Sequence, residues 1–195
     1  MSSSEDLIVR TAARWIDRGS RLDTGALAAE VGVSRTTLFR RVGNREDLMG
    51  DALWLMSDRT IASVTHRWDK ANGPAVRDPA GMLRCLWVMR EYRAAIAGNK
   101  GMRVLLEEEP TVALRVLTDP HGRVQPRVIA QHVDLFARDV ADGGFTPRVD
   151  LDTLAFAVVR LGEGFLYADV LADRTPDLEA ATTLLGALVD TDRGL

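Results

Sequence analysis

Apolar residues recur at helical spacing along nearly the whole chain, and no segment shows the strict alternation of a half-buried strand. The pattern predicts an amphipathic first helix that ends at Gly19, followed by two short helices. Further helices are predicted over residues 45–68, 80–97, 102–108, 111–117, 124–141, 151–171 and 177–189. The sequence therefore predicts an all-α protein.

A helix-turn-helix is predicted between residues 24 and 48. Gly32 can adopt the left-handed backbone that a tight turn between two short helices requires. Thr24 and Ser34 are expected to cap the first and the second of these helices. If Leu38 is the buried position of the second helix, four side chains lie on its outer face or its flanks, namely Thr36, Arg40, Thr37 and Phe39.

Positive charge is concentrated on this second helix. Residues 34–45 contain four arginines and no acidic residue, the arginines being Arg35, Arg40, Arg41 and Arg45. Phosphate binding needs local charge density rather than a basic protein, so the formal net charge of -3 does not oppose it. The pattern predicts contact with double-stranded DNA. The alternative is a surface helix pair with incidental arginines.

The composition is that of an ordinary soluble protein, with 46% hydrophobic and 27% charged residues. The first residues lack the basic start and apolar run of a secretion signal, and no stretch of about 18 residues is free of charge. The single cysteine, Cys85, excludes an intrachain disulfide and a cysteine-based metal cluster. We expect a cytoplasmic protein with no cofactor and no metal site.

The N-terminal segment, from Met1 to about Leu53, resembles the DNA-binding domain of TetR-family transcriptional regulators. The resemblance includes the amphipathic first helix and continues through three motifs, which are GVS at residues 32–34, TLF at 37–39 and GNREDL at 43–48. Tyr, His and Lys are usual in the family where this chain has Phe39, Arg41 and Arg45. Farther along, residues 82–131 resemble the QsdR-type branch, which is associated with quorum-signal lactone degradation.

The resemblance implies about nine helices, with a three-helix DNA-binding domain over residues 1–50 and a ligand-binding and dimerisation domain over residues 51–195. It implies that Arg35, Thr36 and Arg40 face base edges in the major groove. The predicted contacts to the sugar-phosphate backbone are Thr24, Ser34, Thr37, Phe39, Arg41 and Arg45. The implied function is that of a repressor released from a palindromic operator by a small molecule.

A ligand pocket is predicted in the second domain, where large apolar side chains recur together with a few polar ones. Polar groups set in an apolar wall would orient a small molecule. The predicted lining consists of Met82, Cys85, Trp87, Met89, Tyr92, His132, Phe136, Phe156, Arg160 and Glu163. The alternative is plain core, with Arg160 and Glu163 forming only an i,i+3 ion pair.

A homodimer is predicted because the segment 151–171 is apolar around most of its circumference and needs cover on two sides. One side can meet the protomer's own core and the other an identical helix across a twofold axis. The predicted interface residues are Ala155, Leu161, Gly162, Phe165, Ala181, Leu184, Leu185 and Leu188. The alternative is that both helices belong to the core.

Two other classes of function compete with a ligand-responsive regulator. An enzyme is disfavoured, because the chain has no nucleophile elbow and no phosphate-binding loop, and its three histidines are not spaced as metal ligands on one helix. A DNA-binding protein without a small-molecule sensor fits the N-terminal segment equally well. No motif identifies the operator, the effector, or the choice between repression and activation.

Overall fold

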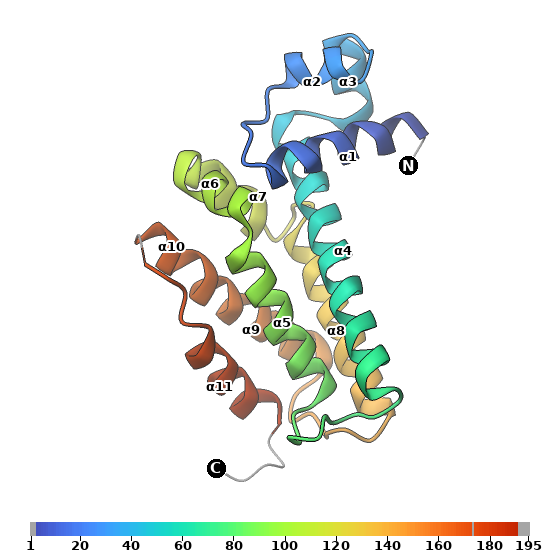
Figure 1. Cartoon of the computed structure of the whole chain (residues 1–195), viewed down its shortest axis with the longest axis vertical. Helices are drawn as coiled ribbons and strands as arrows, with labels where there is room; N and C mark the ends of the chain where they lie inside the picture. Colours follow the sequence, from blue (N-terminus) through green and yellow to red (C-terminus); the bar gives the residue numbers. More distant parts are fainter. Residues whose placement is uncertain (1–2, 173, 191–195) are drawn as a thin grey trace. The chain divides into compact units, whose positions relative to one another are not determined.

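The computed structural model describes residues 3–172 and 174–190 and is predominantly helical (Figure 1). Its elements in chain order are α1 (Ser3–Asp17), α2 (Thr24–Glu30), α3 (Arg35–Val42), α4 (Arg45–Asn72), α5 (Arg84–Gly98), α6 (Lys100–Glu108), α7 (Pro110–Thr118), α8 (Gln125–Ala141), α9 (Leu151–Glu163), η1 (Gly164–Ala168), α10 (Asp169–Leu171) and α11 (Leu178–Val189). Over the described residues, β-structure is limited to an isolated bridge between Arg77 and Leu83. The predicted all-α class is confirmed.

Three helices differ from the prediction by more than two residues or in type. The helix expected over residues 45–68 continues to Asn72 as α4. The helix expected over residues 80–97 begins only at Arg84, because Gly81 has a φ of 84° and the Met82 backbone N–H donates to the Asp78 carboxylate at 2.8 Å. The helix expected over residues 151–171 widens into the π-helical turn η1 after α9. Gly162 and Gly164 lie at this junction, where glycine weakens the preference for a regular helix.

The described residues form two compact units. The first comprises the described residues up to 58 together with residues 99–127, and the second comprises residues 59–98 together with the described residues from 128 onward. The predicted domain division at residue 50 concerns function and stays a prediction. The compact units do not coincide with it, because α6 and α7 fold with the N-terminal helices.

The first unit is held by apolar faces of α1, α2, α3 and the start of α4. Fully or almost fully buried side chains from these helices form its interior, including Ile8, Ile16, Leu27, Leu38 and Leu48. The helix α6 packs against α1. The two backbones are so close at Gly101 of α6 that a Cβ on this residue would overlap the carbonyl oxygen of Ile16. We define α1, α2 and α3 as the head.

The second unit surrounds a core between α5, α8, α9 and α11. Its buried residues include Leu83, Met89, Phe136, Val158 and Leu185. A second cluster joins Trp68 of α4 to Val88 and Tyr92 of α5. Over the described residues, no helix has both the length and the apolar character required to cross a membrane.

A buried ion pair lies inside this second unit. The Arg84 Nε donates to the Asp139 carboxylate at 2.6 Å, and the two side chains are 1% and 0% exposed. A second carboxylate, that of Asp142, lies 2.6 Å from Nη2 of Arg84. Because the Cys85 backbone N–H also donates to Asp139 at 2.7 Å, the pair fixes the start of α5 against α8.

Candidate nucleic-acid interface

The turn between α2 and α3 has the predicted geometry. Gly32 has a φ of 72°, and the Val33 backbone N–H donates to the carbonyl oxygen of Ala28 at 3.0 Å. Ser34 caps α3, because its hydroxyl accepts from the Thr37 backbone N–H at 3.1 Å. The predicted glycine turn and the predicted cap of α3 are confirmed.

The cap of α2 was predicted wrongly. Asp23, rather than Thr24, is the N-cap, and its carboxylate accepts from the backbone N–H groups of Ala26 and Gly25 at 3.0 and 2.7 Å. These two hydrogen bonds lower the pKa of Asp23. Thr24 is the first helical residue and is only 7% exposed, which leaves its side chain little surface for a phosphate. The strong preference of aspartate for N-caps could have revealed this assignment.

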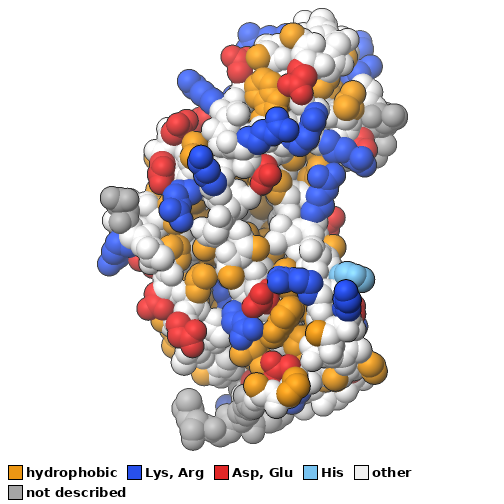
Figure 2. Space-filling model, viewed as in Figure 1, with side chains coloured by type: hydrophobic (Ala, Val, Ile, Leu, Met, Phe, Trp, Pro, Cys, Tyr) orange, Lys and Arg blue, Asp and Glu red, His pale blue; other side chains and the backbone are white. Residues whose placement is uncertain are grey.

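The outer face of α3 is exposed and basic. Arg35, Thr36 and Arg40 are exposed, whereas Leu38 is fully buried. Among the described residues, no acidic side chain forms an ion pair with Arg35 or Arg40. Figure 2 shows several basic side chains on the surface of the head.

Phe39 supports one of these arginines. The guanidinium carbon of Arg35 lies 5.4 Å from the centre of the Phe39 ring, one helical turn away. Thr37 and Phe39 are half-buried on the flanks of this face. Ordering the Arg35 side chain on the ring reduces the conformational freedom that binding must remove.

Arg41 and Arg45, both predicted to contact phosphates, are engaged within the protein. Arg41 donates to the hydroxyl of Ser4. Arg45 makes a bidentate pair with Glu109, with N–O distances of 2.8 and 2.7 Å, and its Nε donates to the carbonyl oxygen of Leu22 at 2.9 Å. The Arg45 side chain is 28% exposed.

Further ion pairs tie residues 99–127 to the head and the first turns of α4. Arg115 pairs with Glu46, and Arg123 pairs with Asp47 at 3.3 Å and with Asp51. Arg21 lies 3.7 Å from the Glu109 carboxylate. These contacts were not predicted, because they join residues far apart in the sequence.

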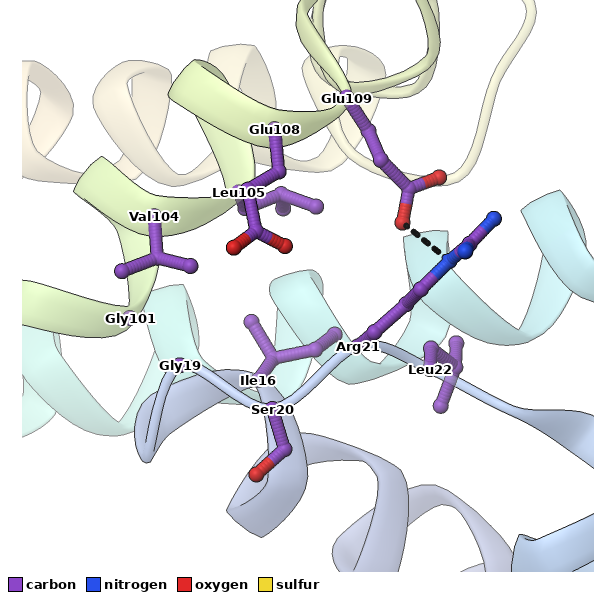
Figure 3. Close-up of a pocket in the computed structure, with 10 residues that line it drawn as sticks. All are labelled: Ile16, Gly19, Ser20, Arg21, Leu22, Gly101, Val104, Leu105, Glu108 and Glu109. Atoms are coloured by element: carbon purple, nitrogen blue, oxygen red, sulfur yellow. Dashed lines mark ion pairs between the residues drawn. The ribbon is translucent and has the colours of Figure 1, made fainter.

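A small cleft lies between the α1–α2 loop and α6, and Figure 3 shows Arg21 reaching across it toward Glu109. Its walls are Ile16, Gly19, Ser20, Arg21 and Leu22 on one side and Gly101, Val104, Leu105, Glu108 and Glu109 on the other. The cleft has room for about one water molecule. It is therefore too small for an organic effector.

The predicted ligand residues separate into several groups. Cys85, Met89, Tyr92, His132 and Phe136 are buried, and Met82 packs at the edge of the same core. The ring centres of Tyr92 and His132 are 6.3 Å apart, and those of His132 and Phe136 are 6.4 Å apart.

The other four predicted ligand residues lie elsewhere. Trp87 packs edge-on against Trp68, with ring centres 5.5 Å apart. Phe156 is 52% exposed and Arg160 is exposed, so α9 turns both of them away from the core. Arg160 pairs with Glu163 at 3.0 Å, as the core alternative predicted.

The predicted dimer residues also separate. Leu161, Leu184 and Leu188 are 44%, 54% and 40% exposed, and Phe165 is half-buried. The remaining four are buried within the protomer and face its own core, namely Ala155, Gly162, Ala181 and Leu185. Helical periodicity alone did not show which side of each helix faces inward.

Comparison with known proteins identifies the family. Residues 80–190 match the family model described as Tetracyclin repressor-like, C-terminal domain. A search of curated protein sequences finds no match to the chain.

Solved structures of TetR-family proteins share the fold. The transcriptional repressor QsdR of R. erythropolis, from the TetR family, is 25% identical, with a TM-score of 0.82 over 96% of this chain and 94% of that one. The multidrug binding protein EbrR is 21% identical, with a TM-score of 0.59 over 97% and 91% of the two chains. A TetR transcription regulator of Haloarcula marismortui is 18% identical, with a TM-score of 0.57 over 98% of each chain. Since the family model spans more than half of the sequence and the helical fold agrees with it, this protein belongs to the TetR family of transcriptional regulators.

Proposed function

We propose that this protein is a homodimeric repressor that binds a palindromic operator through α3 and leaves it when a small molecule binds. The observation that carries the proposal is the exposed, acid-free face of α3, on which Arg35, Thr36 and Arg40 lie. A helix presented in this way enters the major groove in helix-turn-helix proteins. The similar structure from R. erythropolis is named a transcriptional repressor, which supports the same role here.

The contacts to DNA divide into two kinds. Arg35, Thr36 and Arg40 are proposed to read base edges, while Ser34 and Thr37 at the start of α3 contact the sugar-phosphate backbone. Arg41 and Arg45 reach phosphates only if they leave their partners in the protein, Ser4 and Glu109. We therefore assign them a secondary role in affinity.

Exposed leucines support the proposed dimer. Leu161 on α9 and Leu184 and Leu188 on α11 present apolar side chains to solvent in the single chain, and Phe156 adds to this surface. An isologous interface between α9 and α11 of two protomers would cover them. To read successive major grooves, the two recognition helices of such a dimer must lie about 34 Å apart.

Release from DNA is proposed to depend on α6 and α7. These helices belong to the same compact unit as the head and are tied to it by the Arg45–Glu109 and Arg115–Glu46 pairs. A ligand that displaces α6 and α7, or tilts α4, would therefore move the head. It must bind the two arrangements with different affinity, because otherwise it shifts no population.

Footprinting of the DNA upstream of the protein's own gene tests the proposed function. We expect protection of a palindrome whose half-sites are one helical turn apart. Absence of a protected site at protein concentrations that saturate nonspecific DNA would contradict the proposal. If the footprint persists across a panel of metabolites, the sensor is contradicted while the DNA-binding role stands.

Glu109→Gln should change how the protein binds the footprinted operator. The substitution removes the negative charge that holds Arg45 and Arg21, so either cation becomes available to a phosphate. Each new phosphate contact steepens the dependence of log K on log salt by about 0.9, or by about 2 for the two copies in a dimer. Fluorescence anisotropy at several salt concentrations measures this slope.

Glu108→Gln provides the matched control, because Glu108 is an exposed neighbour on the same turn and forms no ion pair within the described part of the chain. It should leave the salt slope unchanged. If Glu109→Gln and Glu108→Gln give the same slope as the native protein, the Glu109 contact does not restrain Arg45.

A further inference from the structure

Arg93 is a buried cation on α5 without an acidic partner among the described residues. The residue is 4% exposed. Its Nη2 donates a long hydrogen bond of 3.4 Å to the hydroxyl of Thr182 on α11, and its Nε has no hydrogen-bond partner within residues 3–172 and 174–190. Two causes lower the pKa of Arg93 to about 10, of which burial is the larger and the nearby positive charge of Arg90 the smaller. The side chain is therefore still a cation at neutral pH.

The other buried arginine of this unit shows that such a charge can be neutralised by the protein itself. Arg84 is 1% exposed and lies 2.6 Å from each of two carboxylates, those of Asp139 and Asp142. A buried ion is costly unless a counter-charge and hydrogen bonds accompany it. In the part of the chain that the structure describes, Arg93 has neither a carboxylate nor a complete set of hydrogen bonds, which distinguishes it from an arginine that only stabilises the fold.

The surroundings of Arg93 combine polar and apolar groups from several helices. Met89, one turn earlier on α5, belongs to the main core. Gly162 of α9 lies beside the Arg93 side chain, since a Cβ on this glycine would be 3.9 Å from Cδ of Arg93. A contact at this distance is an ordinary van der Waals contact, so α9 packs directly against the aliphatic part of the Arg93 side chain.

His132 of α8 adds a neutral polar group near Arg93. Its Nδ1 lies 2.8 Å from the carbonyl oxygen of Val128. A carbonyl oxygen only accepts, so Nδ1 carries the proton and Nε2 is left as an acceptor. Burial, together with the charge of Arg93, lowers the pKa of His132 to about 4, so the imidazole does not add a second positive charge at neutral pH.

A local irregularity lies next to this cluster. The π-helical turn η1 begins at Gly164, two residues after Gly162. Short π-helical turns inside α-helices are frequent at functional sites. This irregularity is independent of the hydrogen-bonding state of Arg93 and points to the same region of the second unit.

We propose that Arg93 is the anchor of the effector site and that the effector is a small molecule with a carboxylate on an apolar skeleton. This inference rests on the proposed function, in which a small molecule releases the protein from DNA. A carboxylate can accept from Nε and from an Nη of one guanidinium at the same time. It would supply the missing counter-charge, while the apolar skeleton lies along the core side of α5 near Met89.

Isothermal titration calorimetry with matched acids and amides tests this inference. The probes are octanoate and 4-phenylbutyrate, each compared with its own neutral amide. We expect the native protein to bind at least one acid about 10- to 100-fold more tightly than its amide, the range for a hydrogen-bonded charge pair. Arg93→Gln should abolish this preference, and Arg93→Lys should keep part of it.

Arg90→Gln is the matched control, because Arg90 lies on the same helix but is 36% exposed and pairs with Glu91 at 3.2 Å. It should keep the preference for the acid. The inference is overturned if neither acid binds the native protein at millimolar concentration, if acid and amide bind equally, or if Arg93→Gln retains the preference. If Arg93→Gln does not fold, the inference is tested by the affinities of acid and amide for the native protein and for Arg93→Lys. It is then overturned if the native protein binds acid and amide equally.

Operator binding without ligand, measured on the same proteins, separates this inference from the proposed function. Arg93 belongs to the second unit and the head to the first, so Arg93→Gln should bind the operator as the native protein does. A protein that binds the operator but no carboxylate contradicts the effector class alone. A protein that binds carboxylates but no operator contradicts the proposed function alone.

Discussion

Replacement of Arg40 by alanine should lower the affinity of the dimer for its operator by about 2 to 6 kcal/mol, because a bidentate arginine–guanine contact contributes about 1 to 3 kcal/mol and a dimer carries two copies. Arg40 is exposed on α3, so the substitution should leave the fold intact. Fluorescence anisotropy with the operator and with a scrambled duplex measures the effect. The loss should be large for the operator and small for the scrambled duplex.

Arg18→Ala is the control for this experiment, since Arg18 is an exposed arginine just after α1 and not on α3. It should affect both duplexes equally and only slightly. If Arg40→Ala leaves the preference for the operator over the scrambled duplex unchanged, the assignment of Arg40 to base readout is wrong.

Arg84→Ala should destabilise the protein by about 3 to 5 kcal/mol, the cost of leaving a buried charge without its partner. Asp139 is 0% exposed, and after the substitution its carboxylate would retain the Cys85 backbone N–H but lose the guanidinium. Chemical denaturation followed by circular dichroism measures the free energy of unfolding. A loss of this size is a large fraction of the total stability of most domains.

Arg138→Ala tests whether burial is the cause. Arg138 of α8 pairs with Asp69 at 2.9 Å, but these side chains are 40% and 42% exposed. Exposed pairs contribute about 0 to 1 kcal/mol. Equal losses of stability for Arg84→Ala and Arg138→Ala would show that the Arg84–Asp139 pair does not stabilise the second unit as its burial suggests.

The head was predictable because its signals are local. A glycine turn at Gly32, a serine cap at Ser34 and a buried Leu38 each act over one or two helical turns, and the structure has all three. The error at α2 was also local, since Asp23 and Thr24 are both suitable caps and the backbone uses the aspartate. Such errors move a boundary by one residue and leave the fold unchanged.

The ligand and dimer residues stay predictions, because the sequence did not show which side of each helix faces the core. On α9, Ala155 and Gly162 face inward while Phe156 and Leu161 face solvent, although apolar residues lie all around this helix. A pattern that is apolar on every side has no period from which an inner face can be identified. The burial of Arg93 was not predicted either, because an arginine on a predicted helix is ordinarily exposed.

The helical class, the helix-turn-helix and the family could be predicted from the amino-acid sequence, because helix periodicity, caps and glycine turns are properties of residues close together in the chain. The partners of the charged side chains depend instead on how the helices pack against one another. Arg45 meets Glu109 across 64 residues and Arg84 meets Asp139 across 55 residues. Such pairs form where packing brings distant helices together and removes water, and no local pattern encodes that proximity.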